Sequence, residues 1–301
     1  MRRLFFIYNP HAGQSRIKSQ LSDILNIFTA AGYEVVVHPT QGSGDALECA
    51  KNAPAGTDLI VCSGGDGTLD ETVTGMMEGG RNIPIGYIPA GSTNDFANSL
   101  GIPSVMRRAA QEIVYGGARA VDIGTMNDDF FVYVAAFGIF TDISYKTKQD
   151  MKNIFGHMAY IFEGARRLAI TDIKSSRLKI TYEGGEFEDD FIYGMITNST
   201  SVGGIKGITG SRVRLDDGLF EVTLIRRPDT PLEMQEMLNA LYDRKVHSSC
   251  LISFKASSLK IDGSEPVDWT LDGEFGGHLE DVNITVMKKA LMLQGIGAMK
   301  F

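Results

Sequence analysis

The sequence predicts two domains, an α/β domain with a doubly wound parallel sheet and a C-terminal antiparallel β-sandwich. A chain of 301 residues with 43% apolar content is long enough for two hydrophobic cores. Up to about residue 120, strand-like runs alternate with helix-like periodicity, whereas beyond it strand-like runs follow one another across Gly, Asp and Asn turns. We expect the α/β domain to span 1–124 with a return at 290–301, and the sandwich to span 125–289.

The first third reads as repeated strand–helix units. Leu4–Tyr8 is a continuous apolar run, as expected for a parallel strand covered on both faces. Apolar residues from Ile17 to Phe28 then recur on one helical face. Further strands are expected at 33–38, 58–62 and 83–88, and further helices around 46–50 and 69–77.

The remaining chain reads mainly as strands. Expected strands lie at 118–124, 130–137, 178–182, 191–197, 220–226, 250–255, 258–261 and 282–287. Two helices are expected among them, near 155–169 and 232–242. Trp269 is expected in the sandwich core.

Composition excludes several functional classes. A net charge of −8 and a pI near 5.2 argue against a protein that binds nucleic acid through overall basicity. No apolar run approaches the roughly 20 residues that span a bilayer, and Met1–Tyr8 reads as a strand rather than a signal peptide. A soluble, cytoplasmic protein is therefore expected.

The cysteines and histidines indicate no metal or disulfide framework. Cys49, Cys62 and Cys250 are odd in number, widely spaced and flanked by apolar residues, which predicts buried thiols. Histidines such as His38 lack metal-ligand spacing.

Three loops each follow an expected strand: Asn9–Gly13, Gly64–Thr68 and Gly91–Asp95. Loops at the carboxyl ends of parallel strands line one crevice, and Thr40 would join the same rim. Glycines there let backbone N–H groups approach phosphate oxygens. The loops predict binding of a nucleoside triphosphate.

The best-known nucleotide motifs are absent. The Gly65–Asp70 segment has Asp70 where a dinucleotide fingerprint needs its third glycine. There is no Gly-Lys-Ser/Thr of a Walker-A loop and no protein-kinase signature.

Four motifs in order resemble the soluble bacterial diacylglycerol kinases, lipid kinases related to sphingosine and ceramide kinases. The motifs are Asn9–Gly13, Gly64–Thr68, Gly91–Ala97 and Leu271–Glu274. Gly-Gly-Asp-Gly-Thr is shared with NAD kinases, but the Asn-Asp-Phe-Ala loop and the late Asp-Gly-Glu separate the lipid group from them. The resemblance implies an N-terminal nucleotide domain, a lipid-holding sandwich and a lipid hydroxyl, as in diacylglycerol, as phosphoryl acceptor.

The resemblance also implies site residues. Glu274 would be the catalytic base, with Asp66 and Asp95 as the other catalytic carboxylates. Because these anions would repel a triphosphate, Mg²⁺ is expected between them. Contacts to ATP are implied for Asn9, Pro10, His11, Ala12, Gly13, Thr40, Gly64, Gly65, Asp66, Gly67, Thr68, Leu69, Asp70, Glu71, Thr93 and Asn94. From the residues alone, Asp66 could equally be a turn aspartate and Asp95 a helix N-cap.

A structural cation is implied at the Asp216-Asp217-Gly218 turn. In similar kinases the second aspartate and flanking carbonyls hold it, which maps to Asp217 with the carbonyls of Arg214 and Leu219. Such oxygens suit Mg²⁺ or Ca²⁺. Without the resemblance, the run reads as an ordinary hairpin turn.

Residues 145–179 are basic within an acidic chain. Phe155, Met158 and Phe162 share a helical face there, so the segment could dock on anionic lipid. A helix of this kind more often covers a sheet with its apolar face and solvates its charges. Arg166 or Arg167 could instead reach the catalytic carboxylates.

Two features depart from the resemblance. Residues 198–205 lack the glycine-rich run of several lipid kinases, so the identity of the lipid substrate is not fixed by the resemblance. Arg16 stands where a lysine is expected. The alternative functions are those of an NAD- or sugar-type kinase and of a non-catalytic nucleotide sensor.

The resemblance further implies that the protein forms a homodimer.

Overall fold

The computed structural model describes residues 1–138, 173–203, 205–206, 209, 213–242 and 246–296. The chain divides into two compact units, Met1–Ile123 with Lys288–Phe301, and Gly124–Met287. It leaves the first unit in strand β5 (Ala118–Met126) and returns to it in strand β15 (Glu274–Gln294). The helix expected at 155–169 lies outside the described residues.

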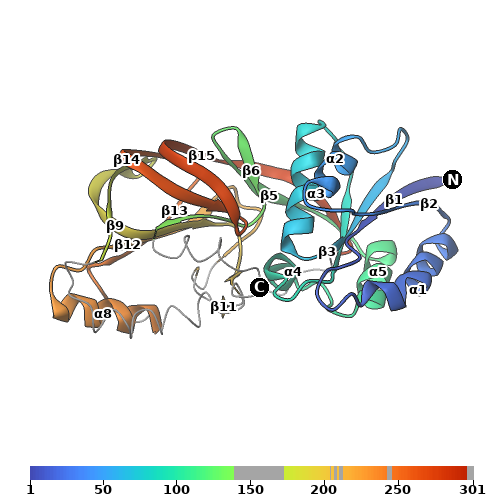
Figure 1. The fold of residues 1–301 in the computed structure, drawn as a ribbon, viewed down its shortest axis with the longest axis horizontal. Coiled ribbons are helices and arrows are strands. Elements are labelled where there is room, and N and C mark those ends of the chain that lie inside the picture. The colour runs from blue at the N-terminus through green and yellow to red at the C-terminus, as the bar shows by residue number, and fades with distance from the viewer. Residues whose placement is uncertain (139–172, 204, 207–208, 210–212, 243–245, 297–301) are drawn as a thin grey trace. The chain divides into compact units, whose positions relative to one another are not determined.

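The first unit is built on a parallel sheet with helices on both faces (Figure 1). Its strands run in the order β2-β1-β3-β4, and Leu293 and Gln294 at the end of β15 pair in parallel with β4. The strands are β1 (Arg2–Tyr8), β2 (Tyr33–Pro39), β3 (Leu59–Gly64) and β4 (Ile85–Pro89). The helices are α1 (Ile17–Ala30), α2 (Asp45–Lys51), α3 (Asp66–Glu78), α4 (Asp95–Leu100) and α5 (Met106–Tyr115).

The apolar strands occupy the centre of this sheet because both of their faces are covered. Every residue of β3 and β4 is buried. Helices α1 and α5 pack together, as do α2 and α3, and Phe6 meets Phe28 of α1 edge to face at 5.9 Å. The predicted doubly wound sheet is confirmed.

Helices α4 and α5 were not among the predicted elements. The buried residues of α5 are Met106, Ala109, Ala110 and Ile113, which do follow helical spacing. Two of these four residues are alanines, but the spacing keeps one helical face apolar, so the periodicity of the sequence was sufficient to predict α5. Gly86 of strand β4 faces Ile113 of α5, and a Cβ atom at Gly86 would come within 2.8 Å of the Ile113 side chain.

The second unit is an antiparallel β-sandwich, as predicted. Besides β5 and β15, its strands are β6 (Asp129–Phe131), β7 (Val134–Gly138), β8 (Ser176–Tyr182), β9 (Gly185–Thr197), β10 (Ser201–Val202), β11 (Ile205–Lys206), β12 (Phe220–Arg226), β13 (Leu251–Ala256) and β14 (Ser258–Leu271). The long strands β9 and β14 each pair with β8 along one part and with β7 along another, while β12 joins β9 to β13. Helix α8 (Pro231–Tyr242) lies where a helix was predicted.

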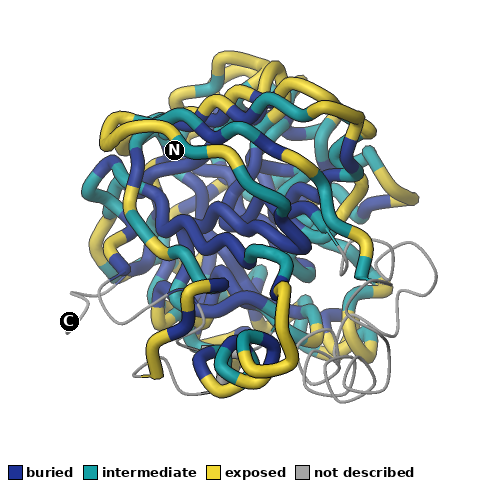
Figure 2. The backbone as a smooth tube through the Cα atoms, turned by 90° about the vertical axis from the view of Figure 1, so that its left-hand side faces the viewer, coloured by how far each residue is buried: buried dark blue, intermediate teal, exposed yellow. Residues whose placement is uncertain are grey.

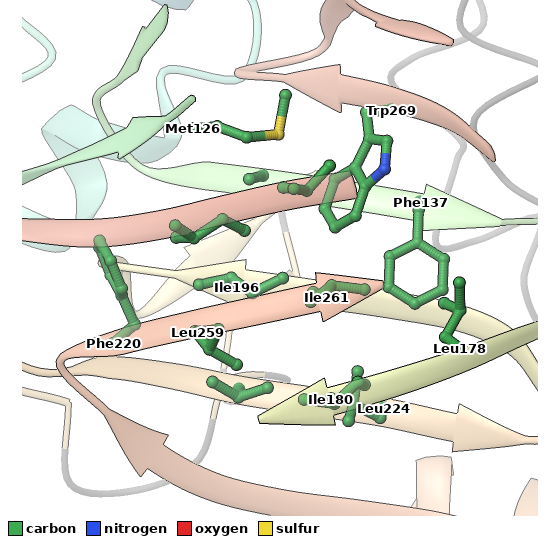
Figure 3. Close-up of a cluster of buried hydrophobic side chains, with 14 of the residues drawn as sticks. Met126, Phe137, Leu178, Ile180, Ile196, Phe220, Leu224, Leu259, Ile261 and Trp269 are labelled. Atoms are coloured by element: carbon green, nitrogen blue, oxygen red, sulfur yellow. The ribbon is translucent and has the colours of Figure 1, made fainter. Parts of the chain in front are cut away.

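Aliphatic side chains fill most of the sandwich core, with Phe137, Phe220 and Trp269 among them (Figure 3). Trp269 is 1% exposed and its ring lies 4.9 Å from that of Phe137. Phe131 stacks on Phe220 at 5.3 Å. The prediction of Trp269 as a core residue is confirmed.

Several strand predictions for this unit were wrong in extent. Strands β14 and β15 reach 14 and 21 residues, and bulges between Asp262 and Val267 and between Trp269 and Thr270 break their alternation. The single strand expected at 130–137 is two strands, interrupted at Val132 and Tyr133. The amides of these two residues donate to the Asp272 carboxylate instead of to a neighbouring strand.

The central strands are buried, whereas exposed residues lie in loops, on outer helix faces and along the long strand β15 (Figure 2). Cys62 and Cys250 are buried as predicted, but Cys49 is only half-buried. None of the helices described here is long and apolar enough to cross a membrane.

Candidate nucleotide site and catalytic turn

Three loops lie side by side at the carboxyl ends of neighbouring strands β1, β3 and β4. The Asn9 amide donates to the Ser63 carbonyl at 2.8 Å, and the Ala90 amide donates to the Gly64 carbonyl at 2.8 Å. The parallel register therefore continues into the loops and fixes their spacing. The structure brings Asn9–Gly13, Gly64–Thr68 and Gly91–Asp95 together at one edge of the sheet.

Glycines are required where these loops touch. A Cβ atom built on Gly91 would lie 2.6 Å from the Cα of Gly65 and 2.8 Å from Asn94 Oδ1. Gly13 has φ +58°, and a Cβ there would overlap the carbonyl oxygen of Ala90. Such bare backbone is the kind of surface that lets amides approach phosphate oxygens closely.

Two asparagines brace the loops. Asn9 accepts a hydrogen bond from the His11 amide at 2.9 Å and donates through Nδ2 to Thr68 Oγ1 at 3.3 Å, which ties the first loop to the second. Asn94 adopts φ 52°, accepts the Gly91 amide at 2.9 Å and donates back to the Gly91 carbonyl at 3.0 Å. Both side chains act on the backbone of their own loops.

Tyr87 of strand β4 links the second and third loops through its hydroxyl group. It is 1% exposed, and its hydroxyl donates to the Gly64 carbonyl at 3.1 Å, with Asn94 Oδ1 at 3.4 Å. Burial raises the pKa of Tyr87 well above its usual value, so the hydroxyl keeps the proton that it donates. Sequence reasoning missed this residue because a tyrosine within an apolar strand looks like core.

Asp66 and Asp95 begin helices α3 and α4 and are joined directly. The Asp95 amide donates to Asp66 Oδ2 at 3.2 Å, and Asp95 is 2% exposed. The Asp66 carboxylate and the Asp95 backbone therefore meet where helices α3 and α4 begin. Hard oxygen donors of this kind fit Mg²⁺, and the glycine backbone beside them fits a polyphosphate.

Three other residues predicted to contact ATP, Thr40, Leu69 and Glu71, have different structural roles in the first unit. Thr40 is buried, and its amide donates to the Tyr8 carbonyl at 2.9 Å, which places it beside the first loop. Leu69 is 1% exposed, so its side chain is core. The Glu71 carboxylate accepts the amides of Gly44 at 2.8 Å and Ala46 at 3.3 Å and thereby caps helix α2.

Glu274 is held by a tight hairpin turn in the second unit. Asp272 has φ 50° and Gly273 has φ 89°, so both central residues of the Leu271–Glu274 turn are left-handed, as in a type I′ hairpin. Glu274 opens β15 and is exposed. Its carboxylate therefore stands at the start of a rigid strand.

Asp272 locks this turn. It is 2% exposed, and its carboxylate accepts the amides of Val132, of Tyr133 at 3.0 Å and of Val134 at 2.8 Å. The Tyr133 hydroxyl donates to the Asp272 carbonyl at 3.3 Å. Sequence reasoning did not single out Asp272, although its place two residues before Glu274 was visible.

At the Asp217 turn a lysine lies where a cation would pair. Asp217 Oδ1 accepts the Leu219 amide at 3.1 Å, and Oδ2 lies 3.2 Å from Lys255 Nζ. Lys255 also pairs with Glu221 at 2.8 Å, while Arg214 lies on the exposed side of the turn. The Asp217 oxygens have the donor chemistry for a hard cation, but a metal ion here would have to displace the ammonium group.

Sequence comparison decides the family. Residues 3–126 match the diacylglycerol kinase catalytic domain, and residues 136–294 match the YegS C-terminal NAD kinase beta sandwich-like domain. Over 288 residues the chain is 34% identical to the diacylglycerol kinase of Bacillus subtilis (strain 168), with 94% of each protein covered. The chain belongs to the diacylglycerol kinase family.

Other relatives in the diacylglycerol kinase family agree along nearly the whole chain. The diacylglycerol kinases of Staphylococcus carnosus and Staphylococcus aureus (strain bovine RF122 / ET3-1) are 31% and 32% identical, each covering 92% of this chain, with 90% and 88% of the relatives covered. A crystal structure of a proposed diacylglycerol kinase from Bacillus anthracis str. Sterne superposes with a TM-score of 0.82 at 25% identity, covering 97% of this chain and 95% of its own. The α/β domain and β-sandwich predicted from the sequence pattern are shared with this relative of known structure.

The basic segment 145–179, for which docking on lipid and covering a sheet were the alternatives, is described only at its end. Arg166 and Arg167 lie outside the described residues. Arg177 pairs with Glu188 at 2.9 Å and Lys179 pairs with Glu186 at 3.0 Å, all on the β8–β9 hairpin. These two cations are therefore neutralised within the sandwich.

Proposed function

We propose that this diacylglycerol kinase family member transfers the γ-phosphoryl group of ATP to a hydroxyl of diacylglycerol or a close relative. The observation that carries the proposal is the packing of three glycine loops at neighbouring strand ends, with Asp66 bonded to the Asp95 amide among them. That surface offers bare amides and carboxylates together, which suits a metal-bound polyphosphate.

The residues divide the work between positioning and proton transfer. Loop amides and Thr68, braced by Asn9 and Asn94, would hold the phosphates of ATP. Asp66 and Asp95 would hold Mg²⁺, which when bound neutralises phosphate charge. Glu274 would accept the proton of the lipid hydroxyl as its oxygen bonds to the γ-phosphorus and ADP leaves. Its exposed position on a locked turn suits a base that must reach substrate.

The test is a phosphoryl-transfer assay with γ-labelled ATP and three acceptors in parallel. Diacylglycerol in mixed micelles, long-chain bases and NAD are each offered to the purified protein, with Asp66→Ala as the matched inactive control. We expect label in a phosphatidic-acid-type product, and loss of that label with Asp66→Ala. Labelled NADP without labelled lipid would overturn the proposal in favour of an NAD-type kinase.

A non-catalytic nucleotide sensor is the second candidate. The retained carboxylates Asp66, Asp95 and Glu274 favour turnover over sensing. ATP binding in calorimetry without consumption of ATP, with every acceptor tried, would establish the sensor instead.

Three further proposals follow from the motifs. Arg214, Asp217 and Leu219 would hold a structural Mg²⁺ in exchange for Lys255. The basic stretch at 145–179 would bring a cytoplasmic enzyme transiently to anionic lipid, which co-sedimentation with anionic and neutral vesicles would test. The chain would form a homodimer, for which light scattering coupled to size exclusion gives the mass.

A further inference from the structure

Three side chains of different donor chemistry converge between strand β2 and helix α2. His38 lies near the end of β2, Asp45 is the first residue of α2, and Cys49 follows one helical turn later. Residues i and i+4 share a helix face, so Asp45 and Cys49 point toward the same neighbour. Within the part of the chain that the structure describes, this is the one group of three such side chains with donor atoms all within 4.8 Å of one another.

Asp45 is the centre of this cluster. His38 Nε2 lies 3.1 Å from Asp45 Oδ2, and Cys49 Sγ donates to Asp45 Oδ1 at 3.4 Å. The Gln41 amide donates to Asp45 Oδ2 at 2.7 Å and orients the carboxylate. All three side chains are half-buried, so they are ordered by packing and still reached by solvent.

We propose that His38, Asp45 and Cys49 bind a transition-metal cation of the Zn²⁺ type, in addition to the Mg²⁺ expected with ATP. Imidazole nitrogen, thiolate sulfur and carboxylate oxygen are the ligands that Zn²⁺ takes, at about 2.0–2.3 Å from the metal. Atoms that are mutually within 4.8 Å reach those distances around one ion through small side-chain rotations. Three protein ligands at a half-exposed position leave a fourth place for water.

Metal binding changes the protonation of one ligand, Cys49. Binding through Nε2 requires the His38 tautomer that carries its proton on Nδ1, so the imidazole stays neutral. The Cys49 thiol releases its proton to solvent on forming the metal–sulfur bond, and Asp45 enters as carboxylate. No redox step is involved.

This site could not be predicted from the sequence because its ligands lack a recognised metal-binding spacing. His38 and Cys49 are eleven positions apart, and only the packing of α2 against the sheet brings them together. The Asp45-x₃-Cys49 spacing was the available signal. It became informative only with His38 beside it.

The test is a titration of the reduced full-length chain with Co²⁺ alone, which reports thiolate ligation through a near-ultraviolet charge-transfer band. We expect one saturable equivalent that Zn²⁺ displaces. Cys49→Ser abolishes the band, and His38→Gln lowers the Zn²⁺ affinity by roughly tenfold or more.

Cys250→Ala is the matched control, because Cys250 is a buried thiol of the second unit outside the cluster. The Co²⁺ charge-transfer band and the Zn²⁺ affinity of Cys250→Ala should equal those of the unsubstituted chain. Circular dichroism confirms that each variant is folded. Absence of a saturable band, or a band that survives Cys49→Ser, overturns the proposal and leaves a hydrogen-bonded His–Asp–Cys cluster. The readout does not depend on kinase activity, so its failure leaves the proposed function untouched.

Discussion

Asp272 and Val134 are joined by two reciprocal hydrogen bonds. The Val134 amide donates to Asp272 Oδ1 at 2.8 Å, and the Asp272 amide donates to the Val134 carbonyl at 2.8 Å. Side chain and backbone of one turn residue are thus both bound to the start of β7. Glu274 follows two residues later, so its place depends on this attachment.

Asp272→Asn should damage catalysis and stability together. Asparagine tolerates the left-handed backbone, but its NH₂ group would face an amide that now donates to a carboxylate oxygen. We expect the free energy of unfolding in urea to fall by about 1–3 kcal/mol. We also expect kcat to fall while KM for ATP stays unchanged.

Asp281→Asn is the control for that variant, because Asp281 is exposed on the same strand β15. It should leave stability and kcat near those of the unsubstituted chain. An Asp272→Asn enzyme that unfolds more easily yet keeps its full kcat would show that Asp272 supports the fold without positioning Glu274.

Gly91→Ala should weaken ATP binding. The added Cβ would lie 2.6 Å from Gly65 Cα, so the second and third loops must move apart. Overlap of this size costs about 1–3 kcal/mol, which corresponds to a rise in the Kd for ATP of roughly 5- to 150-fold. Gly42→Ala, at an open position of the same unit, should bind ATP normally in calorimetry. Equal affinities for the two variants would mean that the loop contact does not shape the nucleotide site.

Glu221 makes stability depend on pH. Burial raises its pKa from 4.5 to about 7, although the nearby Lys255 ammonium opposes part of that shift. Because the folded state holds this proton more tightly than the unfolded state, the contribution is complete below about pH 4.5. It is lost as pH rises through about 7.

Denaturation curves of Glu221→Gln and the unsubstituted chain across pH 4–8 measure this effect. The difference in unfolding free energy should shift in favour of the variant as pH rises. A difference that is constant across the range would show that Glu221 does not titrate in this way.

Mg²⁺ should raise the melting temperature if Asp217 binds it. A metal ion must displace Lys255 from Asp217 Oδ2, so Lys255→Met should increase the stabilisation by Mg²⁺ relative to EDTA. Asp217→Asn should abolish the part of the stabilisation that arises at this turn. Identical Mg²⁺ responses in all three proteins, without nucleotide, would assign the charge balance at the turn to Lys255 alone.

Periodicity in the sequence predicted the class of both units but not all of their elements. Leu4–Tyr8 and the helical face that begins at Ile17 carry strong apolar signals, and both elements form as expected. Helix α5 was missed although its four buried positions follow helical spacing. Strands β14 and β15 were predicted too short because bulges interrupt their alternation.

The candidate site was predictable as motifs and much less so as contacts. The three glycine loops follow parallel strands, so their meeting follows from topology. Bracing by Tyr87 and Asp272 could not be predicted, since both depend on partners fixed only by the folded backbone. Glu71 illustrates the converse, because the carboxylate of a residue expected to contact ATP caps helix α2.

The most direct test of the account is the kinetic effect of Glu274→Gln. Rapid-quench measurement of labelled ATP with diacylglycerol gives the rate of phosphoryl transfer, and calorimetry gives the Kd for ATP. We predict a fall in the transfer rate of about 10²–10⁴-fold, the usual contribution of a general base, with an unchanged Kd for ATP. A transfer rate close to that of the unsubstituted enzyme would contradict the assignment of Glu274 as the base.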